Sequence, residues 1–285
     1  MTETLKLPAP TWFVGCGNMA GAILDGWRLA GIDLGGVTVT RPSGKPVEGT
    51  RVVTSIADAG PPPRLVVLGF KPQKLDEVAP ELRQRLSAKT AVISILAGVE
   101  AASLRQRFPG AGAIIRAMPN LPVAVRRGIT GLFSSDADNA TRDEIGNLFT
   151  ALGFAMWMAD EPRLAALGSV AGAGPAYVAR FIAALTKAGQ GRGLSEEIAA
   201  TIARETVLGT AWMAAATGEE MASIAKRVAS PKGTTEAGLA VLDGEAALDD
   251  MIAATINAAF ARGLQLAEEA KSSGSPSLAD ATRLH

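Results

Sequence analysis

A glycine-rich turn near the start of the chain restricts the fold of its first half more than any other feature. The sequence Gly15-Cys-Gly-Asn-Met-Ala20 follows a short apolar run, residues 11–15, and precedes a segment with helical spacing, residues 19–30. A Gly-x-Gly-x-x-Ala turn between a strand and a helix is typical of dinucleotide-binding folds, although such a turn can also be purely structural. The first glycine permits the tight turn, and the second lets the backbone approach a pyrophosphate. The residues expected to contact the dinucleotide here are Gly15, Gly17, Asn18 and Met19.

Strands and helices alternate after this turn. Apolar runs predict strands at residues 37–40, 64–70, 91–96 and 113–117, with helices at 74–86 and 100–108. Two further strands are expected at 128–133 and 155–158, around a helix at 141–152. Strands alternating with helices of this length indicate a parallel-rich sheet that is covered on both faces.

The second half of the chain has no strand pattern beyond Glu161. Helices are predicted at residues 175–188, 195–216, 218–228 and 245–271. We therefore expect an α/β domain over residues 1–162 and an all-α domain over residues 163–285. The apolar stretch 198–213 is interpreted in two ways, as a central helix buried within one chain or as a surface buried against a second subunit.

Composition excludes several kinds of site. Lys plus Arg and Asp plus Glu both number 28, so no broad basic field exists to attract nucleic acid. Cys16 is the single cysteine and His285 the single histidine, which excludes an internal disulfide and a Cys-rich metal site and leaves almost nothing for a His-based metal site or catalytic triad. We expect no metal, no membrane span and a cytoplasmic protein.

The segment after the second predicted strand bears on the choice of cofactor. An Asp or Glu at this point would bind the ribose hydroxyls of NAD. The chain has Thr40-Arg-Pro-Ser-Gly-Lys45 instead, and the side chains of Arg41, Ser43 and Lys45 can all donate hydrogen bonds to a 2′-phosphate. NADPH is therefore the expected cofactor, with NADH possible; the alternative is a solvated loop with no role in binding.

A second glycine-containing loop lies far along the chain. Ser230-Pro-Lys-Gly-Thr-Thr235 precedes a helical stretch at residues 236–242. Hydroxyl groups and free N–H groups at a helix start form an anion-binding site, or alternatively a plain helix cap.

Six motifs in order make the chain similar to the pyrroline-5-carboxylate reductase family over nearly its whole length. They are Gly15-Cys-Gly-Asn-Met-Ala20, Phe70-Lys-Pro-Gln73, Ser94-Ile-Leu-Ala-Gly98, Arg116-Ala-Met-Pro-Asn-Leu-Pro122, Gly172-Ala-Gly-Pro-Ala-Tyr177 and Ser230-Pro-Lys-Gly-Thr-Thr235. The resemblance implies an N-terminal Rossmann domain and a C-terminal helical dimerisation domain. It implies NAD(P)H-dependent reduction of the small cyclic imine L-1-pyrroline-5-carboxylate to L-proline, the last step of proline biosynthesis, by a homodimer or a higher oligomer built from dimers.

The resemblance also implies roles for individual residues. Those beside the nicotinamide would be Lys71, Pro72, Ala97 and Gly98, and those holding the substrate carboxylate would be Ser230, Gly233, Thr234 and Thr235. Thr235 would also reach the ring nitrogen, as the catalytic residue. The chain departs from the family pattern at Lys232, where glycine is usual, and at Leu121, where threonine is common. We expect Lys232 to point to solvent.

The lack of an internal histidine, a common acid–base group, indicates the type of reaction. A hydroxy-acid dehydrogenase needs a strong acid–base group for the alcohol oxygen, whereas a cyclic imine can arrive already protonated. Hydride transfer to an iminium ion then depends on positioning and electrostatics. Two alternatives are a related imine or β-hydroxy-acid reductase and a non-catalytic NADP-binding sensor or scaffold.

Overall fold

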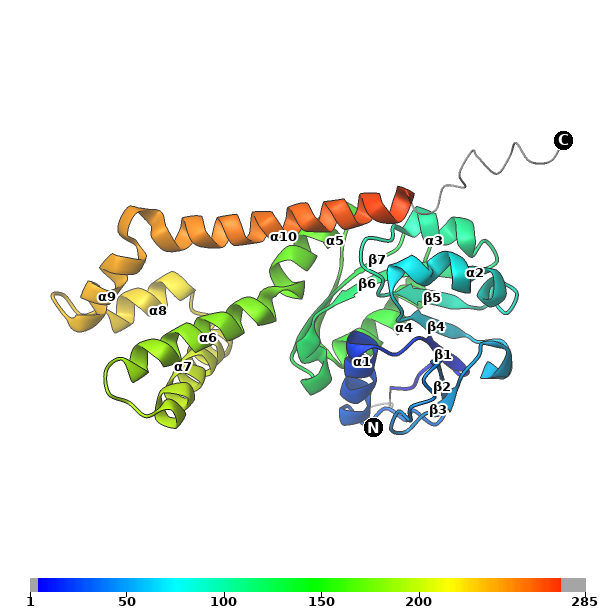
Figure 1. Cartoon of the computed structure of the whole chain (residues 1–285), viewed down its shortest axis with the longest axis horizontal. Coiled ribbons are helices and arrows are strands. Elements are labelled where there is room, and N and C mark those ends of the chain that lie inside the picture. Colours follow the sequence, from blue (N-terminus) through cyan, green and yellow to red (C-terminus); the bar gives the residue numbers. More distant parts are fainter. Residues whose placement is uncertain (1–4, 273–285) are drawn as a thin grey trace. The chain divides into compact units, whose positions relative to one another are not determined.

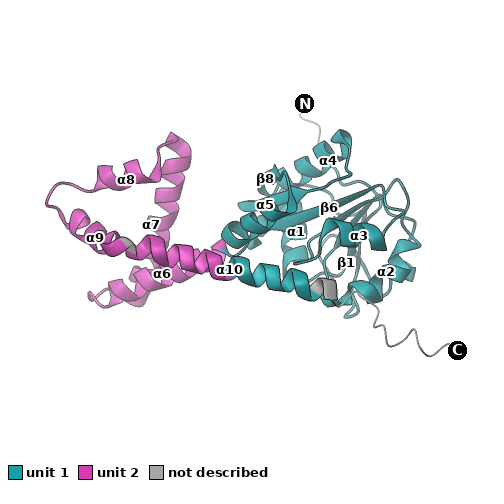
Figure 2. Cartoon of the chain, turned by 90° about the horizontal axis from the view of Figure 1, so that it is seen from above, with its two compact units in different colours: residues 1–173, 259–285 teal, residues 174–258 magenta. Residues whose placement is uncertain are grey.

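The computed structural model describes residues 5–272 of the chain, so His285 lies outside the described residues. The chain forms two compact units (Figure 2). The first unit takes the residues up to Ala173 and those from Ala259 onward, and the second unit takes Gly174–Ala258. This division into compact units does not test the domain boundary expected between residues 162 and 163, which stays a prediction.

The first unit is built on one eight-stranded sheet with the order β3-β2-β1-β4-β5-β6-β7-β8 (Figure 1). The strands are β1 (Thr11–Val14), β2 (Val37–Thr40), β3 (Arg51–Val53), β4 (Leu65–Leu68), β5 (Ala91–Ser94), β6 (Ala113–Pro119), β7 (Gly128–Phe133) and β8 (Gly153–Trp157). Neighbouring strands are parallel except β6 and β7, which are antiparallel. Their connection contains only the short helix η3 (Leu121–Val125), and a parallel crossover needs a longer one. The predicted parallel-rich sheet is confirmed.

Helices cover both faces of this sheet. Helices α1 (Asn18–Leu29) and α4 (Asn139–Thr150) contribute to one apolar cluster, and α2 (Leu75–Arg83) and α3 (Ala101–Arg107) contribute to the other. Strands β1 and β4 are buried along their whole length, because the sheet is covered on both sides. Short helices η1 (Ala57–Ala59) and η2 (Pro72–Lys74) complete this part.

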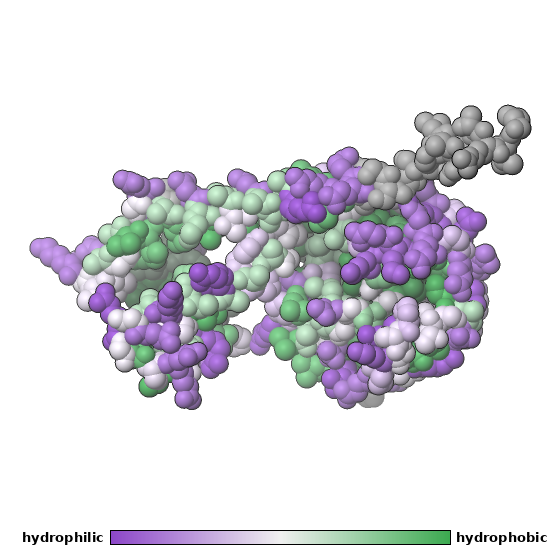
Figure 3. Space-filling model, in the orientation of Figure 1, coloured by the Kyte–Doolittle hydropathy of each residue, from purple (hydrophilic) through white to green (hydrophobic). Residues whose placement is uncertain are grey.

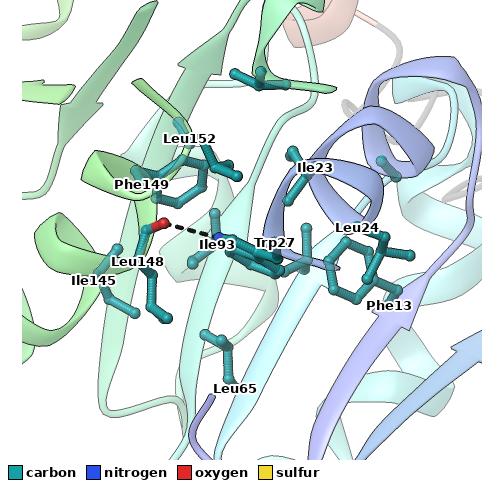
Figure 4. Close-up of a cluster of buried hydrophobic side chains, with 14 of the residues drawn as sticks. Phe13, Ile23, Leu24, Trp27, Leu65, Ile93, Ile145, Leu148, Phe149 and Leu152 are labelled. Atoms are coloured by element: carbon teal, nitrogen blue, oxygen red, sulfur yellow. Dashed lines mark hydrogen bonds between the residues drawn. The ribbon is translucent and has the colours of Figure 1, made fainter. Parts of the chain in front are cut away.

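Trp27 of α1 lies in the apolar cluster between the sheet, α1 and α4 (Figure 4). Its ring packs edge-on against Phe13, with ring centres 5.9 Å apart, and against Phe149 at 6.0 Å. The indole Nε1–H donates a 2.8 Å hydrogen bond to the carbonyl of Leu148, so the buried polar atom is satisfied. This contact joins α1 to α4 and fixes the helix that begins at the glycine-rich turn.

The helical segment that follows β8 was not predicted. Helix α5 (Glu161–Leu167) and the π-helix η4 (Gly168–Gly172) follow β8. The start of α5 has a recognisable signal, since Asp160 accepts a 2.8 Å hydrogen bond from the N–H of Arg163 and Pro162 lies in the first turn. From the sequence alone, Pro162 favours a domain boundary, so no helix is predicted for this segment.

The second unit contains only helices among its described regular elements, which confirms the predicted all-α region. These are α6 (Gly174–Gln190), α7 (Glu196–Thr217), α8 (Met221–Val228), α9 (Thr234–Leu242), the short η5 (Gly244–Ala246) and the first part of α10 (Ala247–Ser272). The helix predicted from residue 218 begins at Met221 instead. Gly218 has φ 69°, a left-handed conformation that ends α7 before α8 can start.

Apolar side chains are exposed on the helices of the second unit (Figure 3). On α7, Ile198 is 52% exposed and Ile202 is 50% exposed, whereas only the small residues Ala199 and Ala203 are buried. The interpretation of this stretch as a central helix buried within one chain is therefore wrong. Exposed apolar surface of this kind is typical of a region that another protein chain covers.

Candidate active site

A cavity of about 650 Å³ lies at the carboxyl ends of the central strands of the first unit. Strands β1 and β4 are neighbours, and the chain leaves them toward opposite edges of the sheet. This reversal is the place where open α/β sheets bind ligands. The cavity is lined by Gly15, Cys16, Gly17, Asn18, Met19, Ala20, Arg41, Pro42, Ser43, Gly69, Phe70, Lys71, Pro72, Ile95 and Ala97.

The tight turn after β1 depends on glycine at two places. Gly15 has φ +82°, and a Cβ at this position would lie 2.8 Å from the carbonyl oxygen of Gly69. A Cβ on Gly69 would in turn lie 2.8 Å from the Cβ of Ala20. Both glycines therefore allow the ends of β1 and β4 to approach each other beneath the cavity. Gly69 was missed in the sequence, although it follows an apolar strand just as Gly15 does.

The start of α1 suits a pyrophosphate. Gly17 is the N-cap residue with φ −86°, and no side chain caps the free N–H groups of the first turn. A Cβ built on Gly17 would meet nothing within 4 Å, so the backbone faces open space. The residues therefore fit a bound dinucleotide, with the phosphates at the positive end of a twelve-residue helix.

The segment after β2 contributes the positive charge that was expected for a 2′-phosphate. Arg41 and Ser43 line the cavity, whereas Lys45 is exposed and does not. The charge of Arg41 acts within the cavity on its neighbour Cys16. Burial raises the pKa of the Cys16 thiol, the positive charge of Arg41 lowers that pKa, and the negative charge of Asp25 raises it.

The residues expected beside the nicotinamide separate into two groups. Lys71, Pro72 and Ala97 line the dinucleotide cavity. Gly98 lines a neighbouring cavity of about 360 Å³, and Ala97 belongs to the lining of both. Gly98 has φ +75°, and a Cβ there would lie 2.9 Å from the backbone carbonyl of Leu266 in α10. Its small size therefore serves the packing of α10 within the first unit.

The loop from Ser230 to Thr235 forms a turn that ends at the start of α9. The N–H of Gly233 donates a 2.9 Å hydrogen bond to the carbonyl of Ser230, and Gly233 is the N-cap residue of α9. Ser230 and Thr234 are exposed, whereas Gly233 and Thr235 are half-buried. The turn thus gathers hydroxyl groups and free N–H groups at a helix start, an arrangement that binds anions such as carboxylates.

Lys232 occupies the strained position of this turn. Its φ is 59°, in the left-handed region that favours glycine, and the lysine is exposed to solvent. The carboxylate of Glu236 accepts a 2.6 Å hydrogen bond from the Lys232 N–H, which holds the turn to the first turn of α9. This geometry explains why glycine is usual at this position in the family pattern.

The structure brings the expected site residues together within each unit. Those of the glycine-rich turn, Arg41 and the segment after β4 share one cavity in the first unit, and those of residues 230–235 share one turn in the second unit. Within residues 5–272, no three side chains of the metal-binding types gather as a group. In the same part of the chain, no helix combines the length and the apolar character that a bilayer crossing needs.

Family models match both units. The model "Pyrroline-5-carboxylate reductase dimerisation" matches residues 161–266. The model "NADP oxidoreductase coenzyme F420-dependent" matches residues 12–98, which contain the dinucleotide cavity.

Three known proteins are similar to this chain over nearly its full length. The pyrroline-5-carboxylate reductase of Pseudomonas aeruginosa is 34% identical over 264 residues, which are 90% of this chain and 96% of that protein. The structure of a pyrroline-5-carboxylate reductase from Coxiella burnetii is 31% identical, with a TM-score of 0.82 over 91% of this chain and 99% of that one. The Plasmodium falciparum pyrroline carboxylate reductase shares the fold, with a TM-score of 0.82, 23% identity and coverage of 91% of this chain and 98% of that one.

Proposed function

The chain belongs to the pyrroline-5-carboxylate reductase family and reduces 1-pyrroline-5-carboxylate to proline with a nicotinamide cofactor, and we propose that NADPH is this cofactor and that Thr235 orients the imine. The reaction completes the biosynthesis of proline. The observation that carries the proposal is that one chain contains both a dinucleotide cavity, in the first unit, and a helix start without a side-chain cap, in the second unit.

The preference for NADPH is supported by Arg41. This guanidinium lines the cavity just after β2, where NAD-binding folds place a carboxylate for the ribose hydroxyls. Arg41 and Ser43 together offer a charge and donors to a 2′-phosphate, which NADH lacks. NADH remains a possible second cofactor.

The cofactor, when bound, would supply the hydride that reduces the imine carbon. The protein's own residues bind and orient the two reactants. In our proposal, Ser230, Gly233 and Thr234 hold the substrate carboxylate at the start of α9, and the hydroxyl oxygen of Thr235 accepts a hydrogen bond from the N–H of the ring iminium. Because an iminium ion is already activated, holding its carbon against the nicotinamide lowers the barrier without a dedicated strong acid.

The proposed assembly is a homodimer or a higher oligomer built from dimers. The match of residues 161–266 to a dimerisation model and the exposed apolar residues of α6 and α7 support it. Light scattering at micromolar concentration tests it, because a stable and active monomer would exclude this assembly. A cytoplasmic location belongs to the same proposal, since the chain has a single cysteine and relies on no internal disulfide; cell fractionation tests it.

The decisive experiment measures NADPH oxidation by the purified protein with L-1-pyrroline-5-carboxylate, in the presence and absence of a metal chelator. We expect proline to form at the same rate in both. Reaction with hydroxy or keto acids alone would favour a β-hydroxy-acid reductase. Binding of NADPH without oxidation in the presence of any imine would favour a sensor or scaffold.

A further inference from the structure

An ion pair between a buried arginine and a half-buried glutamate joins three elements of the first unit beside the dinucleotide cavity. Nη1 of Arg116, in β6, lies 2.6 Å from Oε1 of Glu161, at the start of α5. The same carboxylate oxygen accepts a 3.0 Å hydrogen bond from the backbone N–H of Ala101, the first residue of α3. One carboxylate therefore connects β6, α5 and α3.

Glu161 acts as a capping side chain for the start of α3. The N-cap residue of α3, Glu100, makes no side-chain capping hydrogen bond. A carboxylate at a helix N-terminus satisfies a free N–H group and interacts favourably with the helix dipole. Glu161 thus performs for α3, from sixty residues away, what a local capping side chain usually does.

Burial of Arg116 makes its charge dependent on Glu161. Arg116 is 8% exposed, and a buried guanidinium requires a charged partner. Removal of Glu161 leaves the charge of Arg116 buried without compensation, whereas the Glu161 side chain, at 25% exposure, keeps partial access to solvent. The ion pair and its hydrogen bond to Ala101 thus tie the start of α3 to β6.

The segment before α3 contains Ala97, which belongs to the lining of both cavities. Residues 95–100 connect β5 to α3, and within them Ala97 lines both the dinucleotide cavity and the cavity that contains Arg116 and Glu161. The segment is held at one end by the buried strand β5 and at the other by Ala101. A shift of the α3 start would move Ala97 along with it.

We propose that Arg116 and Glu161 are positioning residues for hydride transfer, which set the place of Ala97 against the nicotinamide through the N–H of Ala101. This inference rests on the proposed function, in which Ala97 lies beside the nicotinamide. Neither residue needs to touch substrate or cofactor for this role.

The test compares Glu161→Ala with Glu161→Gln, which keeps an oxygen acceptor for Ala101 but removes the charge. Asp160→Ala is the matched control, because its carboxylate caps α5 one residue away without contacting α3. For each variant we would measure kcat, KM, the NADPH dissociation constant and the primary isotope effect with NADPH deuterated at the transferred position.

We expect Glu161→Ala to lower kcat by about 10- to 100-fold, the size of loss that small misplacements of reacting atoms produce. NADPH binding should change by less than about 3-fold, and the isotope effect on kcat should rise because hydride transfer becomes slower than product release. Glu161→Gln should recover part of kcat, and Asp160→Ala should lower thermal stability with kcat unchanged.

Two results would overturn the proposal. One is a folded Glu161→Ala protein with wild-type kcat and isotope effect, since the pair would then support stability alone. The other is a loss of NADPH affinity as large as the loss of kcat, since Glu161 would then serve binding. Failure of the wild-type protein to reduce L-1-pyrroline-5-carboxylate would instead contradict the proposed function.

Discussion

Gly15 and Gly69 meet where β1 and β4 end, and a Cβ on Gly15 would lie 2.8 Å from the Gly69 carbonyl oxygen. The first glycine of the turn is therefore required by the protein's own packing as well as by its left-handed φ of +82°. Gly17 differs, because nothing in the chain occupies the space where its Cβ would lie. The two glycines of one motif thus have separable physical roles.

The substitution Gly15→Ala should destabilise the fold. A left-handed alanine costs about 1–2 kcal/mol and the close approach to Gly69 adds about 1–3 kcal/mol, so the free energy of unfolding should fall by about 2–5 kcal/mol. Urea unfolding of the protein without cofactor measures this loss. An unchanged midpoint would contradict the packing role.

The substitution Gly17→Ala is the matched comparison. Because its Cβ points into open space, the urea midpoint without cofactor should stay close to that of the wild type. The new methyl group should stand where the pyrophosphate approaches, which should weaken NADPH binding by roughly 5- to 150-fold. Fluorescence titration with NADPH measures this effect, and wild-type affinity would place the phosphates elsewhere.

The substitution Arg41→Ala should weaken NADPH binding more than NADH binding. A hydrogen bond to a charged phosphate contributes about 1.5–3 kcal/mol, which corresponds to roughly 10- to 150-fold in the dissociation constant. NADH lacks this phosphate and should bind almost as before. Equal losses for both cofactors would mean that Arg41 supports the local structure and does not read the 2′-phosphate.

The substitution Thr235→Ala should lower kcat/KM for L-1-pyrroline-5-carboxylate by roughly 5- to 150-fold, because a hydrogen bond worth about 1–3 kcal/mol is lost. NADPH affinity should be unchanged. Thr235→Ser keeps the hydroxyl and should retain most of the activity. Alanine and serine variants that are impaired to the same degree would show that the methyl group matters, as in a packing role.

The substitution Lys232→Gly should stabilise the protein. Relief of the left-handed lysine gains about 1–2 kcal/mol, and the greater freedom of glycine in the unfolded chain costs about 0.5–1 kcal/mol. The net gain of about 0.5–1 kcal/mol is measurable by urea unfolding, and Lys232→Ala, which keeps a Cβ, should not show it. A glycine variant with raised KM would assign the lysine charge to substrate binding.

The architecture was predictable where local signals and burial agree. The run of apolar residues in β1 and the glycines that follow it predict both a buried strand and the turn, because tight turns and close approaches need glycine. Strand β3 was missed because three residues beginning with Arg51 give too short a pattern. Helix α5 was missed because Pro162 is also a signal for a domain boundary, although proline is common in the first turn of a helix.

The candidate site was predictable only in part for a similar reason. Residues next to a motif, such as Gly17 and Arg41, can be found from sequence because the motif fixes their backbone. The contact of Glu161 with Ala101 joins residues far apart in the chain, and no local pattern announces it. Gly98 shows another long-range contact of this kind, since a glycine there lets the backbone of α10 pack closely against it.

The return of α10 to the first unit affects the order in which the protein is made. Residues from Ala259 onward belong to the same compact unit as the sheet, although they leave the ribosome after all of Gly174–Ala258. The backbone of Leu266 rests on Gly98, which is synthesised long before it. The unit that begins the chain is thus completed last. A nascent chain stopped before residue 259 would expose the backbone around Gly98, because the part of α10 that covers it would be absent.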